Sequence, residues 1–172
     1  SPGSTYYYWV RPKNEIGVGV SSEPTAGILA ATVPSTPGRC QISYVARTSV
    51  RLNWAESYNN GKVVTLHQLY SDGCTGAANP VYTQIYSGIT PETTVTNLVS
   101  GSTCRFQVRV YNALGYSPLS DATTVTICQA PNVPTDLLVF SRDTSEIGIS
   151  WTDPADNGGC MVTHYTVTVD GA

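Results

Sequence analysis

Hydrophobic and polar residues alternate one by one within residues 98–117, and this alternation predicts a β-strand with one buried face. A glycine-bearing turn precedes the strand, and the sequence Asn-x-x-Gly follows it. One face carries Cys104, Phe106, Val108 and Val110, and the other carries Arg105, Gln107, Arg109 and Tyr111. The same turn, strand and Asn-x-x-Gly open the chain at residues 2–17, displaced by 98 positions. The chain therefore contains an internal repeat.

The repeat unit is about 97 residues long, which is the length of one β-sandwich domain. Trp54 and Trp151 are 97 residues apart, and so are Pro37 and Pro134. Each of these prolines closes a linker, at 33–37 and 130–134, because proline cannot donate to a sheet. We therefore predict three domains, which are the C-terminal part of one at 1–33, a complete one at 34–131 and the N-terminal part of a third at 132–172. We expect this chain to be a window of a longer tandem array.

Short strands separated by turn-rich connections fill the middle domain. The predicted strands span 40–44, 50–54, 64–71, 81–86, 93–97, 103–111 and 123–128. Seven strands at this spacing predict an all-β fold, a two-sheet Greek-key sandwich. The register of the third strand stays open, because either Leu66 or His67 could face inward. The predicted core consists of Val50, Leu52, Trp54, Val95, Leu98, Phe106, Val108 and Val110.

The two outer parts repeat pieces of the same pattern. Near the N-terminus, Tyr6, Tyr8 and Val10 are predicted to face a core, while Tyr7 and Trp9 face outward. In the last part, an alternating apolar run that ends at Trp151 repeats the second strand of the middle domain. We predict a further strand at 165–169.

Composition narrows the function classes. Charged residues make up only 12% of the chain, the net charge is −3, and no basic cluster is present, which argues against nucleic-acid binding. The longest apolar runs fall far short of the roughly 20 residues of a membrane helix, so no membrane insertion is expected in this window.

No catalytic or metal-binding constellation stands out. The chain has two histidines and no Cys-x-x-Cys pair, so a zinc site is not expected. His67 is interpreted as a half-exposed strand residue and His164 as a surface residue. The run 153–159 resembles a calcium loop only loosely, and a turn between strands explains it equally well. We predict no enzyme activity, no cofactor and no metal.

The repeated strand with its flanking turns resembles the sixth strand of fibronectin type III domains. The segment from Trp151 to Gly159, followed by Tyr165-Thr-Val-Thr-Val, is similar to their second and third strands. The resemblance implies tandem seven-stranded Greek-key sandwiches. One departure matters, since the family places a tyrosine at the start of its sixth strand as a tyrosine corner. Tyr6 occupies that place in the first copy, but Cys104 occupies it in the second.

The resemblance implies a non-catalytic structural or adhesive array in an extracellular or cell-surface protein. Its function would be spacing and protein–protein contact, with neighbouring modules as partners and possible self-association into a filament. Two alternatives stay open. The modules could be accessory stalks of a receptor or a secreted enzyme, or part of an intracellular cytoskeletal or ciliary scaffold.

Outward-facing aromatic residues are the candidates for an interface. These residues are Tyr7, Trp9, Tyr111 and Tyr116. Exposed aromatic side chains are enriched at protein interfaces, but aromatic residues also favour strands for reasons unrelated to binding. Both interpretations stay open from the sequence.

Five cysteines favour disulfides and thus an oxidising compartment, with buried thiols in a cytosolic protein as the alternative. In the family topology, Cys74 follows the third strand and Cys104 opens the sixth at the same pole, so the resemblance implies that they pair. Cys104 with Cys128 is the alternative pairing. Cys128 and Cys160 belong near one junction between modules and could be bonded there, or Cys160 could be a free loop thiol. Cys40 is left over.

Overall fold

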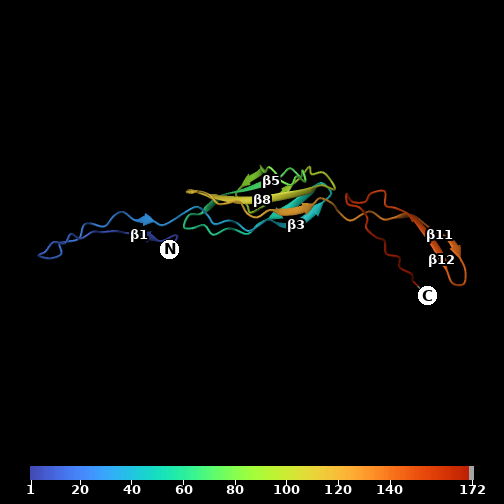
Figure 1. Ribbon diagram of the computed structural model, residues 1–172, viewed down its shortest axis with the longest axis horizontal. Helices are drawn as coiled ribbons and strands as arrows, with labels where there is room; N and C mark the ends of the chain where they lie inside the picture. Colours follow the sequence, from blue (N-terminus) through green and yellow to red (C-terminus); the bar gives the residue numbers. More distant parts are fainter. Residues whose placement is uncertain (171–172) are drawn as a thin grey trace.

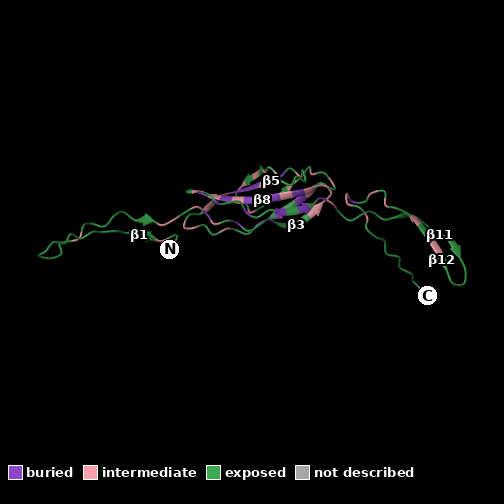
Figure 2. Ribbon diagram, viewed as in Figure 1, coloured by how far each residue is buried: buried purple, intermediate pink, exposed green. Residues whose placement is uncertain are grey.

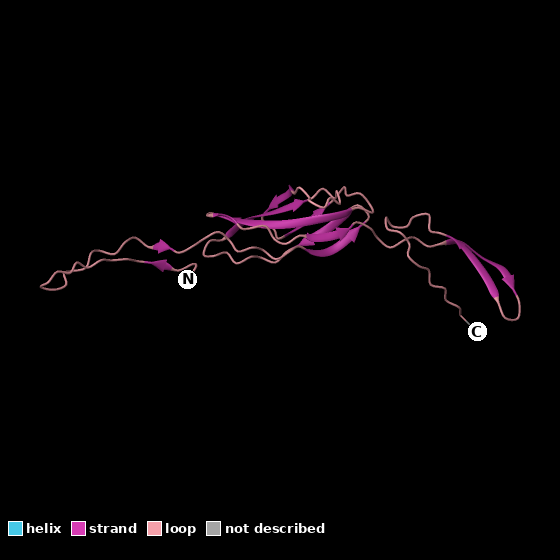
Figure 3. Ribbon diagram, in the orientation of Figure 1, coloured by secondary structure: helices cyan, strands magenta, loops and turns pink. Residues whose placement is uncertain are grey.

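The computed structural model describes residues 1–170, and these residues form strands and no helix (Figure 3). The first and last strand pairs are β1 (Thr5–Tyr6) with β2 (Ile28–Leu29), and β11 (Thr135–Arg142) with β12 (Ile147–Thr152). Between them lie β3 (Gln41–Ala46), β4 (Ser49–Asn53), β5 (Val64–Ser71), β6 (Thr83–Gly88), β7 (Glu92–Val95), β8 (Thr103–Asn112), β9 (Gly115–Tyr116) and β10 (Thr123–Thr126). The predicted all-β class is confirmed.

The middle strands form a sandwich of two antiparallel sheets (Figure 1). One sheet has the order β3-β4-β7, and the other has the order β10-β8-β5-β6, with β9 pairing to the end of β8. Each of the seven predicted strands overlaps one of these strands, and β5 has the predicted bounds. The short strand β9 was not predicted, because it is only two residues long.

The buried residues gather in the middle group of strands (Figure 2). The core cluster draws on β4, β5, β8 and β10. Burial along β8 alternates residue by residue over its whole length, as the hydrophobic pattern predicts. Six of the predicted core side chains are buried, namely Val50, Leu52, Trp54, Phe106, Val108 and Val110. Val95 and Leu98 are only partly buried, and they pack against the edge of this cluster.

The burial of His67 settles the open register of the third strand. The His67 side chain is only 5% exposed, and Leu69 is fully buried beside it, so these residues face inward. The interpretation of His67 as half-exposed is therefore wrong. The reason is a hydrogen bond, because the indole Nε1–H of Trp54 donates to His67 Nδ1 at 3.0 Å and satisfies the buried ring.

The outer parts are less regular than the middle. The prediction that Tyr6, Tyr8 and Val10 face a core is wrong, because all three are exposed. Tyr7 and Trp9, on the other face of the predicted strand, are exposed as well. The strand predicted at 165–169 does not form, and Val167 and Val169 are exposed. The middle sandwich supplies the physical reason. There the equivalent strand, β5, is hydrogen-bonded on both sides by β6 and β8, whereas no strand lies beside 165–169 in the described chain.

The three groups of strands follow one another along the long axis of the molecule (Figure 1). The linkers at 33–37 and 130–134 run between them without strand structure. We keep the domain bounds 1–33, 34–131 and 132–172 as a proposal that rests on the sequence repeat.

Candidate functional site

A disulfide joins Cys74 to Cys104, with their Cα atoms 3.9 Å apart. Cys74 lies in the turn that follows β5, and Cys104 is the second residue of β8. The buried Asp72 strengthens the same corner, because its Oδ1 accepts the backbone N–H groups of Cys74 at 2.9 Å and of Arg105 at 3.0 Å. The disulfide and this carboxylate thus stand where the family resemblance implies a tyrosine corner.

A second disulfide joins Cys128, just after the last strand of the sandwich, to Cys160, in the loop after β12. The Cα atoms of the pair are 5.8 Å apart. The fifth cysteine, Cys40, is free and buried in the core, and burial raises the pKa of its thiol to about 12. A thiol in that environment stays protonated at neutral pH and is therefore a poor nucleophile.

Two of the four aromatic interface candidates lie together on the outer face of the larger sheet. The rings of Tyr111 and Tyr116 are 4.8 Å apart across β8 and β9. Arg109 lies on the same face, with its guanidinium carbon 4.0 Å from the centre of the Tyr116 ring and 5.0 Å from that of Tyr70. Gln68 Oε1 accepts both the Arg109 Nε–H and the Tyr70 hydroxyl, each at 3.0 Å. We call these five residues the Tyr–Arg cluster.

The other two candidates lie elsewhere. Tyr7 and Trp9 belong to the N-terminal arm, where each is 58% exposed, and the structure does not bring them to the Tyr–Arg cluster.

Sequence reasoning missed the roles of Arg109 and Tyr70. Arg109 carried a signal, because it alternates with Tyr111 on the outer face of β8. Tyr70 could not be placed while the register of its strand was open.

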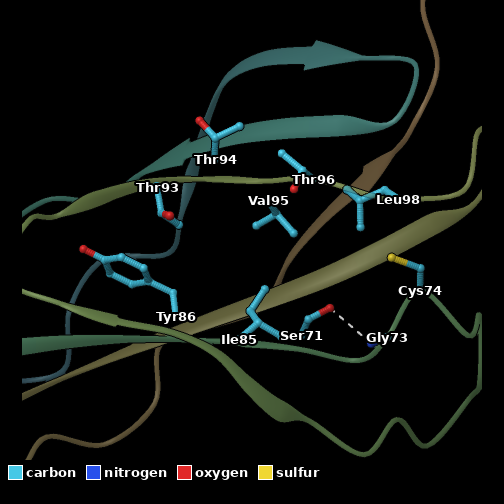
Figure 4. A pocket seen from close by; sticks show the side chains of 10 residues that line it. All are labelled: Ser71, Gly73, Cys74, Ile85, Tyr86, Thr93, Thr94, Val95, Thr96 and Leu98. Atoms are coloured by element: carbon cyan, nitrogen blue, oxygen red, sulfur yellow. Dashed lines mark hydrogen bonds between the residues drawn. The ribbon is translucent and has the colours of Figure 1, made fainter.

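The described residues contain no group of three His, Cys, Asp or Glu side chains that could hold a metal ion. A groove of about 380 Å³ opens between the sheets, where Tyr86, Thr93, Val95 and Leu98 line it (Figure 4). Hydroxyl and apolar groups line this groove, and neither an acid nor a base points into it. No helix long and apolar enough to cross a membrane occurs among the described residues.

The Trp54–His67 hydrogen bond leads us to expect that the free energy of unfolding depends on pH. Burial lowers the pKa of His67 below its usual 6.5, and protonation would place a proton on the Nδ1 atom that accepts the indole N–H. The unfolded chain therefore binds this proton more readily than the folded chain. We expect the free energy of unfolding of the sandwich to fall as the pH drops below about 6.5.

The measurement is urea unfolding at a series of pH values between 7.5 and 5. A His67→Gln variant, whose amide oxygen could still accept the indole N–H, should lose the dependence in this window. Substitution of the exposed His164 by Gln is the matched control and should keep it. Equal pH profiles for wild type and His67→Gln would contradict the assignment.

Known proteins are similar in sequence to this chain over part of their own length. The chain matches no family model. It is 33% identical over 156 residues to chitinase A1 of Niallia circulans, a match that covers 84% of this chain and 20% of that protein. It is 29% identical over 175 residues to human fibronectin type-III domain-containing protein 3A, covering 91% of this chain and 14% of that protein. The chain thus spans a fifth or less of these curated relatives.

Solved structures point to the same fold. Domains A168–A170 of titin superpose with a TM-score of 0.53 at 24% identity, covering 73% of this chain and 42% of theirs. The sixth fibronectin type III domain of human fibronectin type III domain containing protein 3 superposes with a TM-score of 0.50 at 20% identity. That match covers 60% of this chain and 95% of the solved domain. The sheet order of the middle sandwich and the repeat in the sequence agree with these neighbours, and the chain therefore has the fold of a fibronectin type III-like tandem.

Proposed function

We propose that this chain is a non-catalytic spacer in an extracellular or cell-surface protein, where it sets distances and contacts other proteins. Three features support the proposal. The modules follow one another along one axis, the larger sheet presents an ordered aromatic surface, and the groove between the sheets carries no acid–base pair. Modules of this kind in series determine length and stiffness through their number and their linkers.

The observation that carries the proposal is the Cys128–Cys160 disulfide. It ties the end of the sandwich to a loop of the following module, next to the linker that already connects them. Two covalent connections across one junction restrict bending more than a single linker does. Stiffness at a junction benefits a spacer and has no evident use in an isolated binding domain.

The disulfides also support an oxidising compartment, because cytosolic proteins rarely keep such bonds. Non-reducing mass spectrometry of the protein from its natural source tests the location. Alkylation of Cys74 and Cys128 without prior reduction would contradict an oxidising compartment and favour an intracellular scaffold.

The Tyr–Arg cluster is the surface that we assign to protein contact. Tyrosine and arginine are enriched among the residues that dominate binding energy at interfaces. Here the Arg109 guanidinium is held between two rings, so little side-chain entropy would be lost when a partner docks. Lateral association of modules into a filament is one use of such a surface.

The test of the spacer function is a Cys160→Ser variant of the whole chain, studied by small-angle X-ray scattering under oxidising conditions. We expect a broader distribution of molecular dimensions, because the second junction then bends about a single linker. Cys40→Ala is the control, since it also removes a thiol but lies inside the sandwich. An unchanged distribution, together with a titratable thiol at Cys128 in the wild type, would overturn the proposal.

The similarity to chitinase A1 favours a second candidate, in which these modules form the stalk of a secreted enzyme. Both candidates require the same spacing role from the modules. A catalytic domain encoded in the same polypeptide would decide for the stalk.

A further inference from the structure

The structure contains the same contact twice, once at each junction between modules. At the first junction, the backbone N–H of Thr32 donates to Asn60 O at 3.1 Å, and that of Ser35 donates to Tyr58 O at 2.9 Å. At the second, Gln129 N–H donates to Gly158 O at 3.0 Å, and Asn132 N–H donates to Asp156 O at 2.9 Å. In both cases the linker and the residue that precedes it form a short ladder with the loop after the second strand of the next module.

A pair of glycines meets beside each ladder. Gly61 lies against Gly3 at the first junction, and Gly159 lies against Gly101 at the second. Gly3 and Gly101 are 98 positions apart, as are Gly61 and Gly159, and the φ angles agree, at +84° for both turn glycines and +89° and +92° for the loop glycines. The contact thus repeats with the sequence.

A side chain would not fit between these glycines. A Cβ atom on Gly61 would lie 2.9 Å from Ala30 O and closer still to Gly3 N. One on Gly101 would lie 2.7 Å from Gly159 O. Backbone is the neighbour in each case, so no side-chain rotation can relieve the overlap. The close approach therefore requires glycine at Gly61 in the first junction and at Gly101 in the second, whereas a Cβ atom on Gly3 would lie 3.6 Å from the Gly61 Cα, an ordinary contact.

The two junctions differ in what closes the ladder. At the first, the Asn60 side chain adds a bond from Nδ2 to Val33 O at 2.8 Å, and Asn112 Nδ2 donates to Thr32 O at 2.9 Å. At the second, Gly158 stands in the place of Asn60 and adds no side-chain bond. There the Cys128–Cys160 disulfide and an ion pair between Arg47 and Asp156 close the contact instead.

We infer that residues 58–61 and 156–159 are a docking surface whose partner is the preceding fibronectin type III module, recognised by its Gly-Ser-Thr turn and linker. The surface fixes how successive modules are oriented, with amide side chains closing one junction and a disulfide the other. The inference deepens the proposed spacer function and rests on it for its biological use. The glycine contact itself can be tested at the first junction, where no disulfide is present.

The experiment is amide hydrogen exchange on the full chain, read at Thr32 and Ser35. We expect these amides to be protected in the wild type and to lose roughly tenfold or more of that protection in Gly61→Ala, because the added methyl pushes the ladder apart. Gly76→Ala is the matched control, since Gly76 also has a positive φ of +68° but no neighbour within 4 Å. In the control, protection at Thr32 and Ser35 should change by less than about threefold.

Core amides of β8 provide the check on folding and should stay protected in both variants. Unprotected Thr32 and Ser35 in the wild type would overturn the inference, as would equal losses in Gly61→Ala and Gly76→Ala. The Cys160→Ser experiment tests the disulfide at the second junction, and the Gly61→Ala experiment tests the glycine contact at the first. A failure of the proposed spacer function and a failure of this inference can therefore be told apart.

Discussion

Replacing Trp54 by alanine is expected to destabilise the middle sandwich by about 3–5 kcal/mol, enough to unfold much of it. Trp54 is 4% exposed and lies in the core cluster with Leu52 and Phe106. Its ring packs edge-on against Tyr86 at 6.1 Å between centroids. The truncation would leave a cavity and would also remove the only donor recorded for His67 Nδ1 in the described chain. Urea unfolding followed by far-ultraviolet circular dichroism measures the loss.

The chain provides its own control for this substitution. Trp151 is the repeat counterpart of Trp54 but is only partly buried, so Trp151→Ala should leave the unfolding of the sandwich nearly unchanged. Trp54→Phe keeps a ring and should therefore destabilise the sandwich less than Trp54→Ala. Its expected cost is about 1–3 kcal/mol, because the buried His67 Nδ1 loses its donor. If Trp54→Ala were no more harmful than Trp151→Ala, the assignment of Trp54 to the core would be wrong.

Removing the Cys74–Cys104 disulfide by a double substitution to alanine is the second large effect, with an expected loss of about 3–4 kcal/mol. The bond closes a segment of 30 residues, and the chain-entropy relation gives roughly that amount for a loop of this length. Asp72 should keep the corner partly ordered, because its bonds to the backbone of Cys74 and Arg105 do not depend on sulfur. Chemical unfolding of oxidised wild type and variant compares the two stabilities.

Substituting both Cys128 and Cys160 is the matched control, since their separation of 32 residues is nearly the same. The Cys128–Cys160 bond connects the end of the sandwich to the next module and lies outside the sandwich core. Its loss should therefore change the orientation of the modules and not the unfolding of the sandwich. Equal destabilisation by the two double variants would show that the Cys74–Cys104 bond has no special role in the corner.

The sequence by itself determined the elements whose signal is local. Strict alternation from Thr103 onward predicts a strand with Phe106 and Val108 inside, because side chains of a strand point to opposite faces in turn. The spacing between Trp54 and Trp151 predicts the repeat, since identical environments select similar residues at a fixed period. The sixth-strand pattern with its turns was enough to place the fold.

Only the tertiary structure decided the features that depend on partners distant in the chain. His67 faces the core because Trp54 offers it a donor, which no count of alternating residues can reveal. Residues 165–169 have a strand pattern but form no strand, because a strand needs a hydrogen-bonding neighbour as well as a suitable sequence. Gly61 and Gly159 look like ordinary turn residues, and their meeting with Gly3 and Gly101 is visible only once successive modules are placed together. Local patterns encode which face is buried, whereas the identity of the contacting group is set by the folded arrangement.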